Sequence, residues 1–269
     1  MSKLEIVNYI IENKKIPQGF NDYVIVQISD LHNKSFGKNN ISLINKIDQI
    51  NPQVVLITGD IIDGENKNFQ VSLDLLINLT NKYKVYYITG NHEQKALVKR
   101  YKELYKDYFK KLHELSAIHL DNEKIQIKKG NSHINLYGVT IPFKCYKYLF
   151  DKDKSPNLDE NFLQNSLPMI NKNEYNILLA HTPFYFDDYE KWGADLILAG
   201  HVHGGIIRLP VVGGLLSPNR HFFPKYDLGR FDKNDSTMIV TKGLGGSKVL
   251  VRINCKPEIV KITLKSKYY

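Results

Sequence analysis

The amino-acid sequence predicts an α/β protein in which two mixed β-sheets form a sandwich flanked by helices. Its N-terminal part alternates β-rich apolar runs with helical patterns, and its C-terminal part contains mostly further β-like runs. Hydrophobic residues make up 42% of the 269 positions, which is enough for a folded core. No internal repeat or linker divides the sequence, so we expect a single domain over residues 1–269.

The N-terminal part begins with a strand–helix–strand unit. Residues 23–28 are a β-rich run, and isoleucines then recur at every third position from residue 41 to residue 50, which is typical of one helix face. Pro52 ends that helix, and residues 54–58 supply the next strand. Strands joined by a helix pair in parallel, because a parallel connection needs a crossover. Apolar residues between positions 71 and 79 then predict a second helix, and residues 85–89 predict a third strand.

A longer helix is predicted after the third strand. Its apolar residues keep a three-four spacing: Leu97, Tyr101, Leu104, Tyr105, Tyr108, Leu112 and Leu115. The opposite face is rich in lysine, and such a face could rest on a membrane surface. Glu103, Asp107 and Glu114 dilute this positive charge, so we favour a face that is merely solvated.

The remaining elements are mostly strands, interrupted by two long segments. β-like runs lie at residues 124–128, 134–140, 175–180, 196–199, 206–209, 237–241 and 258–264. Residues 143–173 and 217–231 are insertions rich in aromatic and polar residues. Connections of this length are usually functional lids or flexible loops, so we expect lid-like insertions at both places.

Composition narrows the class of protein. The apolar runs are about as long as strands and far shorter than the ~18 residues that a membrane-spanning helix needs, and the N-terminus has no signal-peptide pattern. We therefore expect a cytoplasmic protein, with peripheral contact at the inner membrane face as an alternative. Cys145 and Cys255 are too few for a disulfide framework and are expected to be unlinked. The net charge of +9 is dispersed along the sequence, so no nucleic-acid partner is expected.

Five short polar motifs follow apolar runs in a fixed order. They are Asp30-Leu31-His32, Gly59-Asp60, Gly90-Asn91-His92-Glu93, His181 and Gly200-His201-Val202-His203. A residue at the carboxyl end of a buried strand points into the crevice where open α/β sheets bind ligands. The motifs therefore deliver two Asp, one Asn and five His to one rim. Such oxygen and nitrogen donors hold first-row divalent metals.

This ordered set of motifs resembles the calcineurin-like metallophosphoesterase superfamily, over residues 23–264. The resemblance implies a four-layer sandwich fold and two divalent metal ions per chain. It implies that one ion is bound by Asp30, His32 and His203. The other ion would be bound by Asn91, His181 and His201, and Asp60 would bridge the two ions. Manganese is our first expectation for the metal, with iron or zinc as alternatives, because such donors discriminate poorly among these ions.

The same resemblance implies two catalytic residues beside the metals. His92 would face the substrate and stabilise or protonate the leaving oxygen, and Asp63 matches the acid that pairs with this histidine. A carboxylate partner raises the pKa of a histidine and keeps it as a proton donor. Glu93 is expected to cap the helix that follows, whose first amides favour an acid. Arg220, in the second insertion, is the candidate for a contact with substrate phosphate.

The segments after the last motif narrow the resemblance further. Gly-His-x-His-Gly-Gly followed by a segment ending at Pro210, together with Phe223-Pro224-Lys225-Tyr226, looks like a bacterial subgroup that includes UDP-2,3-diacylglucosamine pyrophosphatase-like enzymes and broader phosphodiesterases. We therefore expect a metal-dependent phosphoric ester hydrolase in which a hydroxide bridging two metals attacks a phosphodiester or pyrophosphate bond. The substrate would be a small phosphate ester, either nucleotide- or lipid-linked. A phosphomonoesterase, a nuclease of the same fold and a non-catalytic docking module are the alternatives.

Overall fold

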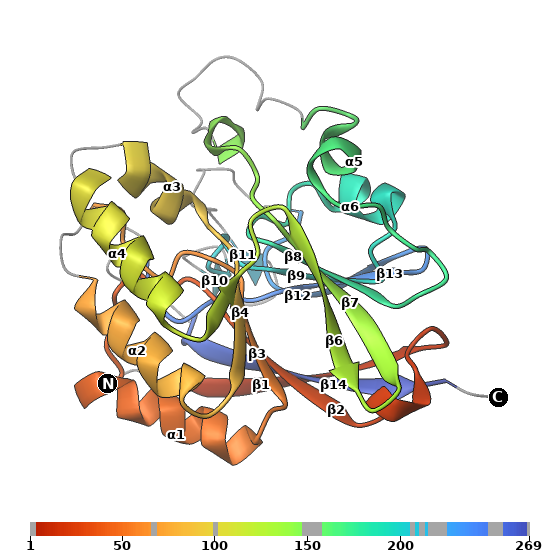
Figure 1. The fold of residues 1–269 in the computed structure, drawn as a ribbon, viewed down its shortest axis with the longest axis horizontal. Helices are drawn as coiled ribbons and strands as arrows, with labels where there is room; N and C mark the ends of the chain where they lie inside the picture. Colours follow the sequence, from red (N-terminus) through yellow and green to blue (C-terminus); the bar gives the residue numbers. More distant parts are fainter. Residues whose placement is uncertain are drawn as a thin grey trace.

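Two β-sheets pack face to face at the centre of the molecule, with helices on both outer faces (Figure 1). The structure is a computed structural model. It describes residues 4–65, 69–98, 102–146, 158–204, 208–209, 213–214, 225–246 and 255–267. Within these residues each main sheet has six strands, and a small antiparallel pair, β10 (Arg208–Leu209) and β11 (Gly213–Gly214), stands apart from them.

The first sheet contains the strands of the N-terminal part and both terminal strands. Its order is β1 (Glu5–Asn13), β14 (Glu258–Ser266), β2 (Tyr23–Ile28), β3 (Val54–Ile57), β4 (Lys84–Tyr87) and β5 (Ala117–His119). Strands β2 to β5 are parallel, whereas β14 runs antiparallel to β2 and parallel to β1. The carboxyl ends of β2, β3 and β4 therefore meet at one rim.

The second sheet has the same mixed character. Its order is β12 (Gly229–Lys233), β13 (Ser236–Val240), β9 (Leu196–Ala199), β8 (Asn176–Ala180), β7 (Ser132–Val139) and β6 (Glu123–Lys129). Its four central strands are parallel, and β12 and β6 pair antiparallel at the two edges. The carboxyl ends of β8 and β9 thus form a second rim.

The core between the sheets is built from the inward-facing aliphatic residues of both. Ile25, Val54 and Leu56 of the first sheet belong to the same buried cluster as Ile177 and Leu198 of the second. All five are 0% exposed, so this layer is fully removed from water. Burial of such side chains contributes roughly 1.5–3 kcal/mol each to stability.

Helices cover the outer face of each sheet. On the first sheet lie α1 (Ile41–Ile50), α2 (Gln70–Thr80), α3 (Asn91–Val98) and α4 (Lys102–Glu114), whose apolar sides share one core cluster with β2, β3 and β4. On the second sheet lie α5 (Phe162–Ser166), α6 (Phe186–Trp192) and the 3-10 turn η3 (Phe143–Tyr146). Two further 3-10 turns are η1 (Gln18–Phe20) and η2 (Lys38–Asn40). The predicted sandwich of two mixed sheets flanked by helices is confirmed.

The sequence patterns located most elements, with several omissions. The strands predicted at residues 23–28, 54–58 and 85–89 correspond to β2, β3 and β4, and the isoleucine spacing corresponds to α1. The helix predicted from Leu97 onward corresponds to the end of α3 and to α4, and residues 99–101 lie outside the described residues. Strands β1, β5 and β12 and helix α6 were not predicted as elements.

The predicted insertions are partly described. In residues 143–173, η3 and α5 pack on the outer face of the second sheet, with Leu163 and Leu167 buried there. In residues 217–231, Gly229–Phe231 pair with β13 as part of β12 rather than forming a loop. Their role as lids stays a prediction, as does the single-domain organisation.

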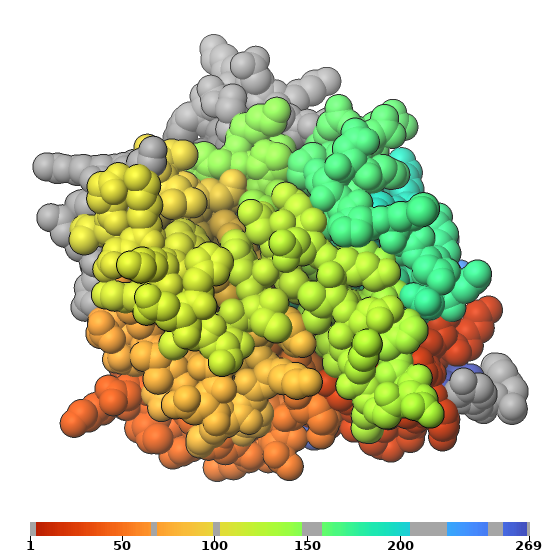
Figure 2. Space-filling model, in the orientation of Figure 1, coloured from red at the N-terminus to blue at the C-terminus, as the bar shows by residue number. Residues whose placement is uncertain are grey.

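The lysine-rich helix α4 lies on the surface seen in Figure 2. Lys106 pairs with Glu103 at 2.9 Å and Lys111 pairs with Asp107 at 3.1 Å, so acids on the same face neutralise part of its charge. Among the described ranges, none of the helices combines the length and apolar character needed to cross a bilayer. Cys145 and Cys255 are buried and are not joined by a disulfide bond, in agreement with the expected unlinked thiols.

Candidate metal centre

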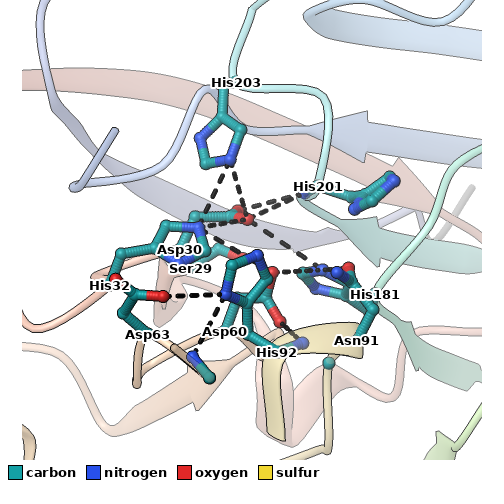
Figure 3. A network of polar contacts seen from close by, with 12 residues as sticks. Ser29, Asp30, His32, Asp60, Asp63, Asn91, His92, His181, His201 and His203 are labelled. Carbon is teal, nitrogen blue, oxygen red and sulfur yellow. Dashed lines mark hydrogen bonds and ion pairs between the residues drawn. The ribbon is translucent and has the colours of Figure 1, made fainter. Parts of the chain in front are cut away.

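All seven predicted ligands lie together where the rims of the two sheets meet (Figure 3). Loops after β2, β3 and β4 supply Asp30, His32, Asp60 and Asn91, and loops after β8 and β9 supply His181, His201 and His203. Their side chains are at most 4% exposed. This convergence follows from the parallel strands, because residues just beyond their carboxyl ends share one edge.

Five of these residues have a left-handed backbone conformation. The φ angle is +52° at Asp30, +48° at His32, +53° at Asp60, +70° at His201 and +54° at His203. Asp, Asn and His are the non-glycine residues that adopt this region most often. The chain turns sharply at each strand end, and the turn directs the side chain into the space between the sheets.

The first group of candidate ligands is Asp30, His32 and His203. The Nε2 atoms of His32 and His203 are 3.3 Å apart, and they lie 3.8 Å and 3.7 Å from Asp30 Oδ1. Asp30 is oriented by the backbone N–H of His201, which donates to both carboxylate oxygens at 3.2 and 3.1 Å. Burial lowers the pKa of His32 to about 3, so its ring is neutral and has a free lone pair at neutral pH.

The second group surrounds His181. Its Nε2 atom is 3.2 Å from Asp60 Oδ2 and 3.1 Å from Asn91 Oδ1, and a nitrogen of His201 lies within 4.8 Å of the Asp60 and His181 ligand atoms. His181 Nδ1 donates to the Thr58 carbonyl at 2.6 Å. Because a carbonyl only accepts, the proton of the neutral ring sits on Nδ1 and Nε2 is left available.

Asp60 lies between the two groups. Its Oδ1 accepts the backbone N–H of His92 at 2.8 Å, while Oδ2 faces His181 and also lies 3.8 Å from His32 Nε2. Burial raises the pKa of Asp60, but the nearby histidines outweigh burial and hold the pKa well below its usual range. A permanent carboxylate charge therefore stands between two sets of ring nitrogens.

The donor set fits two divalent cations. Ligand atoms bound at about 2.1 Å in tetrahedral or octahedral geometry lie roughly 3.0–3.4 Å from one another. The separations of 3.3, 3.2 and 3.1 Å fall in this range, whereas Asp30 Oδ1 lies somewhat farther from His32 and His203, at 3.8 and 3.7 Å. Burial lowers the pKa of His181, yet the charges of Asp60 and Asp30 outweigh it and raise the pKa to about 10. The same negative potential that favours a proton at Nε2 favours a metal cation there.

His92 lies beside the first group with Asp63 behind it. Its Nδ1 is 3.4 Å from Asp63 Oδ1 and accepts the Gly64 N–H at 3.2 Å. The neutral ring can thus accept from Gly64, and the protonated ring can donate to Asp63. Burial lowers the pKa of His92, but Asp60 and then Asp63 outweigh burial and raise it. The predicted pairing of His92 with Asp63 is present. One nitrogen of His92 also lies within 4.8 Å of the His32 and Asp60 donors, at the border of the first group.

Glu93 does more than the predicted helix cap. It accepts the N–H of Gly90 at 2.9 Å, just before α3, and also those of Asp60, Ile61 and Ile62 at 2.9, 2.8 and 3.3 Å. Burial, followed by the charge of Asp60, raises the pKa of Glu93 to about 7, whereas its backbone donors favour the carboxylate. Glu93 therefore ties the Asp60 loop to the helix start that presents Asn91 and His92.

Close packing explains the glycine of the Gly-Asn-His-Glu motif. A Cβ atom at Gly90 would overlap the Asp60 carboxylate and its backbone nitrogen. The two loops that Glu93 joins can approach only because this position has no side chain.

Two residues outside the predicted motifs form hydrogen bonds to the backbone of the loops that present the candidate ligands. The Leu244 N–H donates to the Ser29 carbonyl at 3.0 Å and supports the turn at Asp30. The Cys255 thiol donates to the His203 carbonyl at 3.0 Å. Arg220, the predicted phosphate contact, lies outside the described residues.

A model of the calcineurin-like phosphoesterase family matches residues 23–205, which is more than half of the chain and includes every motif named above. The chain belongs to this family. It is accordingly a metal-dependent phosphoric ester hydrolase, as the sequence predicted, and the family's use of divalent metal ions agrees with the clustered donors.

Individual relatives agree with this assignment. The uncharacterized metallophosphoesterase YkuE of Bacillus subtilis is 27% identical over 98% of this chain and 86% of the relative. A Danio rerio protein named as a transmembrane protein with metallophosphoesterase domain is 26% identical over 97% of this chain and 57% of its own length. A solved Staphylococcus aureus structure described as a candidate 5′-nucleotidase gives a TM-score of 0.53 at 13% identity, over 91% of this chain and 55% of that one. The chain thus spans little more than half of the latter two proteins, and the structural likeness supports the fold.

Proposed function

We propose that this hydrolase cleaves a phosphodiester or pyrophosphate bond at a centre of two divalent metal ions. The observation that supports the proposal is the position of Asp60, whose Oδ2 faces ligand nitrogens of both groups. In this proposal Asp30, His32 and His203 hold one ion, and Asn91, His181 and His201 hold the other, with Asp60 bridging. When bound, such a pair activates water and neutralises the phosphoryl oxygens.

His92 would act on the leaving group. Asp60 and Asp63 raise the pKa of His92, which favours the protonated ring, and the side chain stands beside the first ligand group. In this proposal His92 donates its proton to the departing oxygen, and Asp63 orients the His92 ring. General acid catalysis of this kind contributes typically about 10²–10⁴-fold.

The substrate classes to screen are small nucleotide-linked and lipid-linked phosphate esters, with manganese as the first metal and iron and zinc as alternatives. The name of the Danio rerio relative makes peripheral contact with a membrane worth testing. The ion pairs along α4 reduce the attraction that its lysines could exert on anionic lipid, so membrane contact is the weaker part of the proposal.

Substitution Asp60→Asn tests the two-metal proposal. Asn suits the left-handed backbone and removes only the charge, so we expect a folded protein that loses metal and hydrolysis of bis-p-nitrophenyl phosphate. Metal content would be measured by mass spectrometry, and turnover with paired diester and monoester p-nitrophenyl substrates. Asp107→Asn on the exposed face of α4 is the matched control. Unchanged metal content and diester turnover in Asp60→Asn would refute the proposal, and faster monoester than diester turnover in the parent would favour the phosphomonoesterase alternative.

A further inference from the structure

The side chain of Tyr146 packs against two of the candidate ligands. Tyr146 is the last residue of η3 and is 3% exposed. Its ring forms a T-shaped pair with the His201 ring, at 5.1 Å between centroids and 70° between planes. Its ring is also 5.9 Å from that of His181, and the His181 and His201 rings are 5.1 Å apart. Three rings from separate parts of the chain thus form one buried cluster at the second ligand group.

The backbone of η3 and of the residues just before it is fixed from two sides. Gln94 Nε2 of α3 donates to the Ile141 carbonyl at 2.9 Å, and the Tyr185 hydroxyl donates to the Cys145 carbonyl at 3.2 Å. Gln94 stands on the same helix that begins with Asn91, so η3 is attached to the element that supplies the remaining donor of this group. Tyr146 is therefore held at a defined position relative to Asn91, His181 and His201.

The ring of Tyr146, rather than its hydroxyl, makes these contacts. Among the residues that the structure describes, the buried hydroxyl has no hydrogen-bond partner. Burial raises the pKa of Tyr146 well above its usual range, so the phenol stays neutral. The edge-to-face geometry of the ring restricts the rotamer of the histidine that it covers.

We propose that Tyr146 is a positioning residue that holds His201 and His181 in the orientation needed for the second divalent ion. This inference rests on the two-metal proposal above. Ordered partners that support metal ligands typically change metal affinity about 10–100-fold when they are removed. The expected effect is selective, because Tyr146 contacts neither His32 nor His203 among the ring contacts of the described residues.

The test measures metal binding rather than activity. Metal-free parent protein, Tyr146→Leu and Tyr146→Phe would be titrated with Mn²⁺ by calorimetry and by electron paramagnetic resonance. We expect the parent and Tyr146→Phe to bind two ions that show exchange coupling. In Tyr146→Leu the first ion should bind normally and the second about 10–100-fold more weakly, leaving the signal of an isolated ion.

A second tyrosine gives a matched control. Tyr137 is buried in the same cluster of apolar residues and forms a T-shaped pair with Trp192, and the ring contacts of the described residues include none between Tyr137 and a candidate ligand. Tyr137→Leu should lower the free energy of unfolding while both ions bind with the affinities of the parent. Should Tyr146→Leu fail to fold, Tyr146→Met, which fills more of the space, provides the same comparison.

The outcomes separate this inference from the proposal on which it rests. Normal binding of both ions to Tyr146→Leu would overturn the role of Tyr146 while leaving the two-metal proposal intact. Loss of the second ion in Tyr146→Phe as well would overturn the role of the ring. A parent protein that binds fewer than two ions would instead overturn the two-metal proposal.

Discussion

Replacement of Glu93 by Gln should destabilise the protein out of proportion to the small chemical change. The carboxylate accepts two N–H groups at each oxygen, those of Asp60 and Gly90 at Oε2 and those of Ile61 and Ile62 at Oε1. An amide has one oxygen and one NH₂ group, which cannot accept. Whichever way the amide turns, two buried N–H groups lose their acceptor.

The magnitude follows from this count. A buried donor without an acceptor costs roughly 1–3 kcal/mol, so two of them cost about 2–6 kcal/mol. Removing a buried charge recovers part of this cost, since desolvation of the carboxylate is unfavourable. We therefore expect a loss of about 1–4 kcal/mol, a large part of the roughly 5–15 kcal/mol that stabilises a typical domain.

Urea unfolding followed by circular dichroism measures this loss. The experiment belongs at about pH 8, where Glu93, with its pKa near 7, is ionised. Glu103→Gln is the matched control, because Glu103 is exposed on α4 and its pair with Lys106 should contribute at most about 1 kcal/mol. A loss below about 1 kcal/mol in Glu93→Gln would show that the four hydrogen bonds do not hold the loop and helix together.

Two other predictions concern catalysis and pH. His92→Asn should lower kcat about 10²–10⁴-fold without changing metal content, and Asp63→Asn should lower kcat less, by about tenfold. The loss of kcat in His92→Asn should be larger for a substrate with an alkyl leaving group than for one that releases p-nitrophenol. Equal losses for the two substrates would exclude a proton-donor role for His92. Burial raises the pKa of Tyr23 to about 12, so the folded state holds this proton more tightly than the unfolded chain. The stability that this raised pKa contributes to the folded state is fully present below about pH 10 and is lost as the pH rises through about 12. It amounts to about 1.4 kcal/mol for each unit by which the folded and unfolded pKa values differ. Between about pH 9 and about pH 11, the urea concentration at the unfolding midpoint should decrease less for Tyr23→Phe than for the parent. An equal decrease in both proteins would contradict the raised pKa of Tyr23.

The sequence predicted which side chains would lie together, because strand ends are easy to recognise. A buried strand is a short apolar run, and the first polar residues after it must lie at the rim, as Asp30 and Asp60 do. The parallel arrangement then brings distant motifs together. Loops after strands of different sheets meet at the centre, and His181 lies 3.2 Å from Asp60 although the two residues are far apart in the chain.

The features that the sequence missed depend on tertiary contacts. In the part of the chain that the structure describes, strand β1 lies at a sheet edge and pairs with β14 alone, and its mixed burial gives no clear alternation. The apolar spacing through Leu97 continues from α3 into α4, so spacing alone cannot show that two helices share it. Glu93 and Tyr146 matter through what they touch, and no motif records that Glu93 reaches the Asp60 loop or that Tyr146 covers His201.

The left-handed turns at the strand ends restrict how this centre can be altered. A side chain in that region costs roughly 1–2 kcal/mol in most residues, while Asp, Asn and His adopt it more readily. A residue at any of these positive-φ positions, from Asp30 to His203, must therefore tolerate the left-handed backbone as well as supply a donor atom. A thiolate introduced at His32 or His203 to favour softer metals would meet that backbone cost before any gain in affinity. Metal preference in this protein is thus coupled to loop conformation, and redesign toward other metals would have to begin with the turns.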